Sequence, residues 1–132
     1  MDRLFLDANI LFSAAYQANA GLVRFWRLAQ VTLCSSAYAV EEARVNLATE
    51  AQRRRLDRLA RRLRLFEAAG EELPQGVELP EKDRPILLAA MAVSATHLIT
   101  GDFRHFGRYF GKRVAGILVL TPADYLRQRL RS

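Results

Sequence analysis

Residues 3–12, RLFLDANILF, place a short apolar run directly before Asp7 and a helix-compatible stretch directly after it. The run at residues 3–6 predicts a buried strand, and the stretch over residues 8–16 predicts a helix. Asp7 would then lie at the carboxyl end of the strand. A strand, an acid and a helix in this order are typical of α/β folds, in which the helix packs back on the sheet.

The rest of the chain repeats this alternation of short strands and helices. The other strands that we expect are residues 31–34, 65–66, 97–100 and 117–120. The other helices that we expect are residues 22–29, 35–47, 50–63, 84–94 and 122–129. Residues 70–82 read as a loop, and residues 101–113 as a turn with short helical pieces. This order predicts parallel βαβ units with helices on both faces of one sheet.

Length and composition predict one globular domain over residues 1–132. Hydrophobic residues make up 51% of the chain and charged residues 26%, which is typical of folded proteins. No apolar run reaches the roughly 18 residues of a membrane helix, and residues 1–12 do not resemble a signal peptide, so we expect a cytoplasmic protein with no membrane partner. The single Cys34 excludes an intrachain disulfide and a zinc site built from several cysteines.

The chain is basic, with 20 basic residues, 14 acidic residues and a net charge of +6. Such a balance favours a polyanionic partner, nucleic acid first. Residues 53–64 contain seven arginines and one acid, Asp57. Arg54 and Arg58 of this segment can form a track for phosphates, but the segment can equally be a solvated helix face or a docking face for an acidic protein segment.

Acidic residues recur where the predicted strands and helices meet. Asp7 ends the first strand, Asp102 lies two residues past the HLIT strand, Asp83 begins a helix, and Glu41 and Glu42 lie on the helix after the second strand. Each can be explained alone as a helix cap or a solvated acid. Together they repel, because two carboxylates ~5 Å apart at an effective dielectric constant of ~20 cost about 3 kcal/mol. Such a cluster indicates a divalent cation, and oxygen ligands favour Mg²⁺ or Mn²⁺.

Three segments carry a family resemblance. LFLDANILFSA (residues 4–14) resembles the D-x-N signature of PIN-domain nucleases, and SSAYAVEEARVNL (35–47) resembles their central segment. LPEKDRPILLAAMAVSATHLITGDFRHFG (79–107) resembles their second half, an Asp that opens a helix and a T-G-D after a strand. The central spacing selects Glu42 over Glu41, because a leucine follows Glu42 five residues later.

The resemblance implies a three-layer α/β/α sandwich with a parallel sheet of about five strands. It also implies a metal-dependent nuclease that cleaves RNA, a homodimer, and for VapC-type members an antitoxin partner in a toxin–antitoxin pair. The acids carried over as catalytic and metal-binding residues are Asp7, Glu42, Asp83 and Asp102, supported by Asn9 and Thr100. Arg104 stands where some members have a further acid, which leaves the number of metal ions open.

Two sets of neighbours extend the expected site. Arg84 and Arg104 lie beside the acids in sequence and are candidates to bind RNA phosphates. The tract FRHFGRYFG (residues 103–111) follows Asp102, and its aromatic residues can stack on bases or anchor the last helix. A signalling receiver domain fits poorly because a strand separates Asp2 from Asp7, serines rather than an aspartate follow the VTLC strand, and only Lys112 is available as its lysine. A catalytically inactive binding module and a DNA nuclease stay open as alternatives.

Overall fold

The structure, a computed structural model, describes residues 1–68 and 72–131. These residues form a six-stranded sheet in the order β3-β2-β1-β4-β6-β5. Every neighbouring pair is parallel except β5 and β6. The strands are β1 (Asp2–Leu6), β2 (Val31–Ser35), β3 (Arg64–Leu65), β4 (His97–Ile99), β5 (Arg113–Val114) and β6 (Ile117–Leu120).

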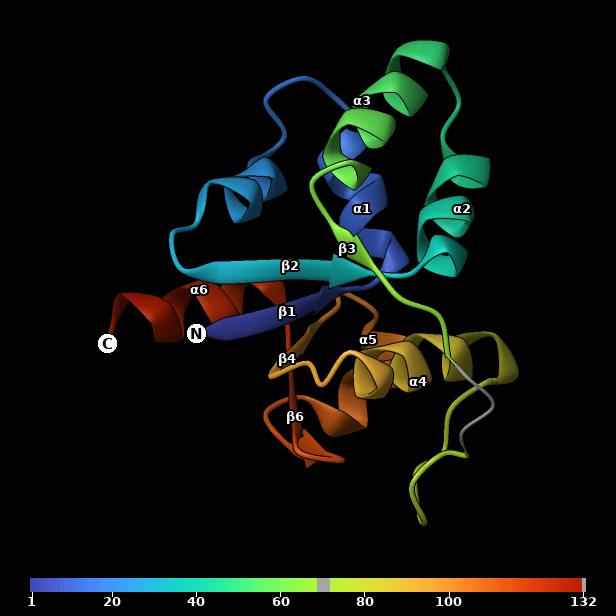
Figure 1. Cartoon of the computed structure of the whole chain (residues 1–132), viewed down its shortest axis with the longest axis vertical. Coiled ribbons are helices and arrows are strands. Elements are labelled where there is room, and N and C mark those ends of the chain that lie inside the picture. Colours follow the sequence, from blue (N-terminus) through green and yellow to red (C-terminus); the bar gives the residue numbers. More distant parts are fainter. Residues whose placement is uncertain (69–71, 132) are drawn as a thin grey trace.

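Helices cover both faces of the sheet, and Figure 1 shows α1, α2 and α3 grouped on one side of β1 and β2, with α4 on the other. The α-helices are α1 (Ala8–Ala15), α2 (Ala37–Asn46), α3 (Glu50–Ala60), α4 (Arg84–Ala92), α5 (Phe103–Phe106) and α6 (Pro122–Leu130). The 3₁₀ helices are η1 (Gly21–Arg27), η2 (Glu81–Asp83) and η3 (Gly107–Tyr109). The predicted α/β sandwich is therefore confirmed, and its sheet, expected to be parallel with about five strands, has six strands with β5 antiparallel.

The centre of the sheet explains why these short strands form. Leu4, Phe5 and Leu6 of β1 are fully buried, as are Leu98 and Ile99 of the neighbouring β4. A strand covered by helices on both faces must be apolar on successive residues rather than on alternate ones. The continuous apolar runs of β1 and β4 meet this requirement, and they pair in register from Leu4 to Leu6.

Two elements differ from the sequence-based prediction. Residues 21–27 form a 3₁₀ helix where an α-helix was expected, and Phe25 and Trp26 are its buried residues. The antiparallel strand β5 was not predicted at all. It joins β6 through Ala115 and Gly116, which both have positive φ angles of 53° and 81°. Two central residues with positive φ form the tight turn that two antiparallel strands favour.

The strand order reverses at β1. The chain runs from β1 outward through β2 to β3, and then returns through α4 to β4 on the other side of β1. In open α/β sheets, ligands bind outside the carboxyl ends of the strands at such a switch point. Asp7 and Thr100, which follow β1 and β4, lie at this point, where the Asp7 backbone N–H donates to the Ile99 carbonyl oxygen at 3.1 Å.

The expected loop over residues 70–82 is described only from residue 72 onward, and residues 70–71 lie outside the described part of the chain. Residues 72–80 contain no helix or strand, in agreement with the prediction, and η2 then leads into α4. No helix in the described residues has the length and apolar character needed to cross a bilayer.

Candidate functional site

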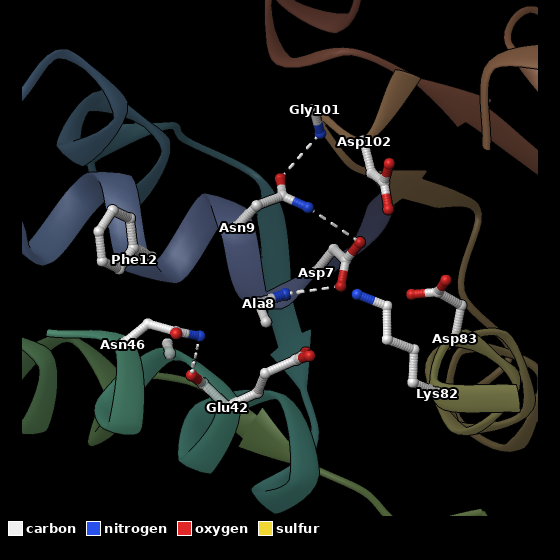
Figure 2. Close-up of a pocket in the computed structure, with 11 residues that line it drawn as sticks. Asp7, Ala8, Asn9, Phe12, Glu42, Asn46, Lys82, Asp83, Gly101 and Asp102 are labelled. Carbon is white, nitrogen blue, oxygen red and sulfur yellow. Dashed lines mark hydrogen bonds between the residues drawn. The ribbon is translucent and has the colours of Figure 1, made fainter. Parts of the chain in front are cut away.

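The four predicted acids line one cleft at the switch point. The cleft has a volume of about 500 Å³, and Figure 2 shows its residues converging from the ends of β1 and β4, from α2 and from the turn before α4. The lining residues are Asp7, Ala8, Asn9, Phe12, Glu42, Ala43, Asn46, Lys82, Asp83, Gly101 and Asp102. Carboxylates that are far apart in the sequence therefore share one small volume.

Asp7 is the most deeply placed of these acids, with only 3% of its surface exposed. Its Oδ1 accepts the backbone N–H of Ala8 at 2.7 Å, and its Oδ2 accepts the Thr100 hydroxyl at 2.8 Å. Burial raises the pKa of Asp7 to about 6, against a lowering by the Thr100 and Ala8 hydrogen bonds and a further raising by Asp83 and Glu42. The ionised form of Asp7 therefore lowers the stability of the folded protein relative to the protonated form.

Asn9 and Thr100 join the ends of β1 and β4. The Asn9 side chain donates to Asp7 Oδ2 at 3.1 Å and accepts the Gly101 backbone N–H at 2.8 Å. Thr100 Oγ1 also accepts the Asp102 backbone N–H at 3.1 Å. These bonds fix the Asp7 carboxylate and the backbone before Asp102 relative to each other, as expected of residues that support a site.

Asp83 does not act as a simple helix cap. It lies just before α4, yet its side chain makes no capping hydrogen bond, and only 6% of the residue is exposed. Its Oδ2 is buried and accepts no hydrogen bond within the described residues, although His105 Nδ1 lies 2.9 Å away. Burial, more than any neighbouring charge, raises the pKa of Asp83. A buried carboxylate oxygen without a donor is costly, and native folds retain few such groups.

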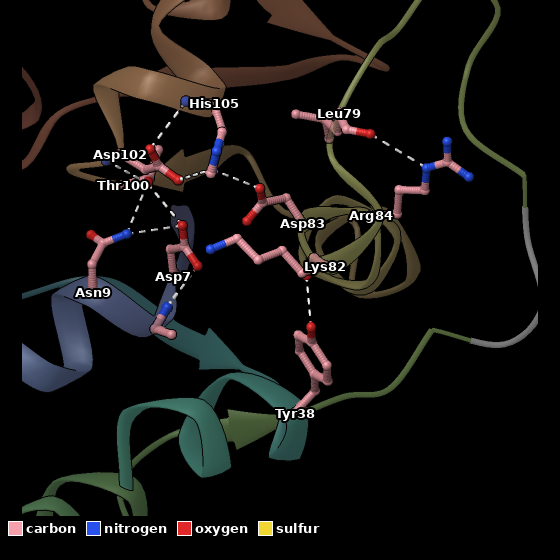
Figure 3. Close-up of polar contacts among 11 residues, drawn as sticks. Asp7, Asn9, Tyr38, Leu79, Lys82, Asp83, Arg84, Thr100, Asp102 and His105 are labelled. Atoms are coloured by element: carbon pink, nitrogen blue, oxygen red, sulfur yellow. Dashed lines mark hydrogen bonds and ion pairs between the residues drawn. The ribbon is translucent and has the colours of Figure 1, made fainter. Parts of the chain in front are cut away.

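Asp102 competes with Asp83 for the Nδ1 atom of His105. Its Oδ1 caps α5 by accepting the His105 backbone N–H at 3.1 Å, and its Oδ2 lies 2.8 Å from His105 Nδ1. Because an ionised carboxylate only accepts hydrogen bonds, this contact fits a tautomer of His105 whose Nδ1–H donates a hydrogen bond to Asp102. Figure 3 shows the imidazole of His105 placed between Asp102 and Asp83. The sequence analysis did not single out His105 as a partner of the acids, although its position three residues after Asp102 was a usable signal.

Glu42 lies at the cleft and Glu41 does not, as the sequence spacing predicted. Glu42 lines the cleft, whereas Glu41 is exposed and pairs with Arg44 at 3.4 Å. Lys82 is a second residue that sequence reasoning missed, and its side chain extends into the cleft toward Asp7 and Asp83 (Figure 2). The Tyr38 hydroxyl donates to the Lys82 carbonyl oxygen at 2.7 Å and so ties this turn to α2.

None of the four predicted phosphate-binding arginines lines this cleft. Arg84 is directed toward the Leu79 carbonyl oxygen and away from Asp7 (Figure 3). Arg104 is exposed beside a neighbouring hollow. Arg54 pairs with Glu50 on the exposed face of α3, and Arg58 is exposed on the same helix. A role for these side chains in RNA binding stays a prediction.

Much of the arginine-rich segment has a structural role. Arg55 donates to the carbonyl oxygens of Ala15 and Tyr16, which end α1. Cationic side chains at a helix C-terminus satisfy carbonyls that lack partners within the helix. The other arginines of the segment that donate to backbone carbonyls are Arg53, Arg61 and Arg62. The charge of this segment is therefore only partly available for a polyanion.

The arrangement can bind a divalent cation. One ligand atom from each of Asp83, Asp102 and His105 lies within 4.8 Å of the other two. The buried Oδ2 of Asp83 fits such an ion, because a cation would satisfy an acceptor that takes no hydrogen bond from the described residues. Carboxylate oxygens suit Mg²⁺ or Mn²⁺ rather than a soft metal.

Comparison with known families decides the relationship. The family model described as PIN domain matches residues 3–104, which include all four acids. The chain belongs to the PIN-domain family. No curated protein matches this PIN domain significantly.

Two solved structures share the fold of this PIN domain. One is the VapBC2 complex of Rickettsia felis bound to a DNA fragment from its promoter, with 18% identity, a TM-score of 0.67, and coverage of 90% of this chain and 98% of that chain. The other is FitAB bound to an IR36 DNA fragment, with 20% identity, a TM-score of 0.52, and coverage of 90% and 94%. At this level of identity the likeness supports the fold alone.

Proposed function

We propose that this PIN domain is a divalent-metal-dependent endoribonuclease. The observation that carries the proposal is the buried Oδ2 of Asp83, which accepts no hydrogen bond from the described residues, in a cleft that also holds Asp7, Glu42 and Asp102. A site that served only to bind RNA would gain nothing from four acids, because they repel phosphates. The same acids are useful when a cation reverses the local charge.

Asp7, Asp83 and Asp102 would hold Mg²⁺ or Mn²⁺, with Glu42 facing it across the cleft. When bound, such an ion makes a water molecule more acidic and stabilises charge on the leaving oxygen of a phosphodiester. Asn9 and Thr100 orient Asp7, and the Nδ1 proton of His105 orients Asp102. The Lys82 ammonium is positioned to contact a phosphate that enters the cleft.

The fold also supports a toxin of a type II toxin–antitoxin pair as the biological setting. Both matched structures, VapBC2 and FitAB, are complexes bound to DNA. We propose by analogy that this chain acts with an antitoxin protein and as a homodimer, in keeping with the sequence-based expectation. Copurification of a small protein encoded beside this chain would test the first point, and sedimentation would test the second.

The proposed activity predicts cleavage that depends on a metal ion. Purified protein is expected to cut single-stranded RNA in Mg²⁺ or Mn²⁺, to stop in EDTA, and to recover when Mn²⁺ is added in excess. A gel assay on an end-labelled RNA checks this result. Cleavage that persists in EDTA, or no cleavage with either ion on any RNA tested, would contradict the proposal.

Glu42 and Glu41 offer a matched pair of substitutions on one helix. Glu42→Gln removes a charge that faces the cleft, and we expect it to lower the cleavage rate by about 10- to 100-fold, the range seen when groups around a metal are changed. Glu41→Gln removes an exposed charge beside it and is expected to change the rate by less than about twofold. Equal cleavage rates for the two variants would show that Glu42 has no role in cleavage.

A further inference from the structure

An open apolar groove adjoins the acidic cleft. It has a volume of about 1320 Å³ and lies between α1, η1, α6 and the segment after Asp102. Phe12 and Gly101 line both the groove and the cleft, so the two hollows are neighbours. Figure 2 shows Phe12 on α1, further along the helix than Asn9. A polymer that is held in the cleft can therefore reach this groove.

Phe103 is one of three exposed large apolar side chains in the groove, with Tyr16 and Leu130, and it is the one beside the acids. It follows Asp102 directly, and 70% of its surface is exposed, whereas Phe106 in the same short helix is buried. The Phe103 ring packs edge to face against Phe110, with the ring centroids 5.0 Å apart. This contact holds the ring in the groove, next in sequence to Asp102 of the cleft, and leaves most of its surface exposed. An exposed aromatic ring beside a site of chemistry marks a surface that a ligand covers.

The charges around the groove suit a nucleic-acid strand. Arg24 and Arg127 line it, and Arg127 pairs with Asp124. Arg24 is exposed and makes no ion pair within the part of the chain that the structure describes. Single-stranded nucleic acids bind where bases stack on aromatic rings and cations follow the phosphates. The groove combines these features, and the two lining residues that it shares with the cleft favour RNA over a protein segment as its occupant.

We propose that Phe103 and the groove form a subsite for a nucleobase that flanks the scissile phosphate of single-stranded RNA. This inference rests on the proposed nuclease function and adds to it how the substrate is held. Phe103 supplies the stacking face, Phe110 keeps its ring in place, and Arg24 neutralises the neighbouring phosphate. Stacking on a ring is tolerant of base identity, so the subsite selects unpaired RNA rather than a particular sequence.

Binding of two RNA probes tests the subsite without cleavage. Fluorescence anisotropy in EDTA and at low salt would compare labelled oligoadenylate with an oligomer of equal length whose central nucleotides are abasic. The wild-type protein is expected to bind oligoadenylate more tightly than the abasic probe. Phe103→Ala should weaken oligoadenylate binding by at least about fivefold and leave abasic binding unchanged. Phe103→Trp should restore the difference, and Phe66→Ala, an exposed phenylalanine outside the groove and the cleft, should keep it.

The outcomes separate this inference from the proposed function. Equal losses for both probes in Phe103→Ala, or no loss, would overturn the subsite. A shift from dimer to monomer in sedimentation, without a base-specific loss, would also overturn it and assign the groove to a protein contact. Cleavage by the wild-type protein is measured separately. Tighter binding of oligoadenylate than of the abasic probe, without cleavage, would support the subsite and reject the nuclease. Cleavage without any difference between the two probes would support the nuclease and reject the subsite.

Discussion

Replacing Asp102 with asparagine is expected to lower metal-dependent RNA cleavage by at least about 100-fold and to leave the fold intact. The fold should survive because Asp102 Oδ1 caps α5, and asparagine caps a helix as well as aspartate does. Cleavage should fail because asparagine removes the charge that Oδ2 offers to His105 and to a cation. A cleavage assay in Mn²⁺ and a thermal melt followed by circular dichroism measure the two effects separately.

A charge-matched variant provides the control. Asp57→Asn removes one carboxylate from α3, where Asp57 pairs with Arg44 outside the cleft, and is expected to keep cleavage within about threefold of the wild-type rate. A lower melting temperature in Asp102→Asn together with lost cleavage would point to a structural role only. Cleavage by Asp102→Asn at the wild-type rate would remove Asp102 from the catalytic machinery.

The sequence was sufficient to predict where the acids would gather. The apolar residues before Asp7 and Asp102 can only be buried as central parallel strands, and parallel strands end at one edge of the sheet. The capping alternative was partly right, because Asp102 caps α5 and Asp7 accepts the Ala8 N–H. It fails for Asp83, whose side chain caps nothing. That distinction needed coordinates, because a capping acid and an orphaned acid look alike in sequence.

Partners that depend on side-chain direction could not be predicted. Lys82 and Arg84 flank Asp83, yet Lys82 points into the cleft and Arg84 points toward Leu79. Which of two neighbours faces a site depends on the turn of η2, and short 3₁₀ turns have no clear sequence period. The arginines of residues 53–64 posed the same problem, since Arg55 binds the end of α1 and Arg58 does not. The sequence shows where the charged residues are, but it does not show which groups their side chains contact.

The free energy of unfolding should fall by about 2.4 kcal/mol between pH 4 and pH 7 because of Asp7 alone. Burial raises its pKa from 3.8 to about 6 in the folded state, and each unit of difference is worth about 1.4 kcal/mol. The protonated form is the favoured one in the fold. Its contribution to stability is therefore complete below the unfolded value of 3.8 and is lost as the pH rises through about 6. Urea unfolding in EDTA across this range measures the fall.

Asp7→Asn isolates that contribution because asparagine cannot ionise. The wild-type free energy of unfolding minus that of Asp7→Asn should drop by about 2.4 kcal/mol between pH 4 and pH 7, whatever the substitution costs in hydrogen bonds. Thr100→Val should move the fall in unfolding free energy to higher pH, because the Thr100 hydroxyl lowers the pKa of Asp7.

At pH 7, saturating Mn²⁺ should stabilise the wild-type protein and not Asp7→Asn. A pH-independent difference would mean that Asp7 is not strained by burial, and equal stabilisation by Mn²⁺ would exclude it as a ligand.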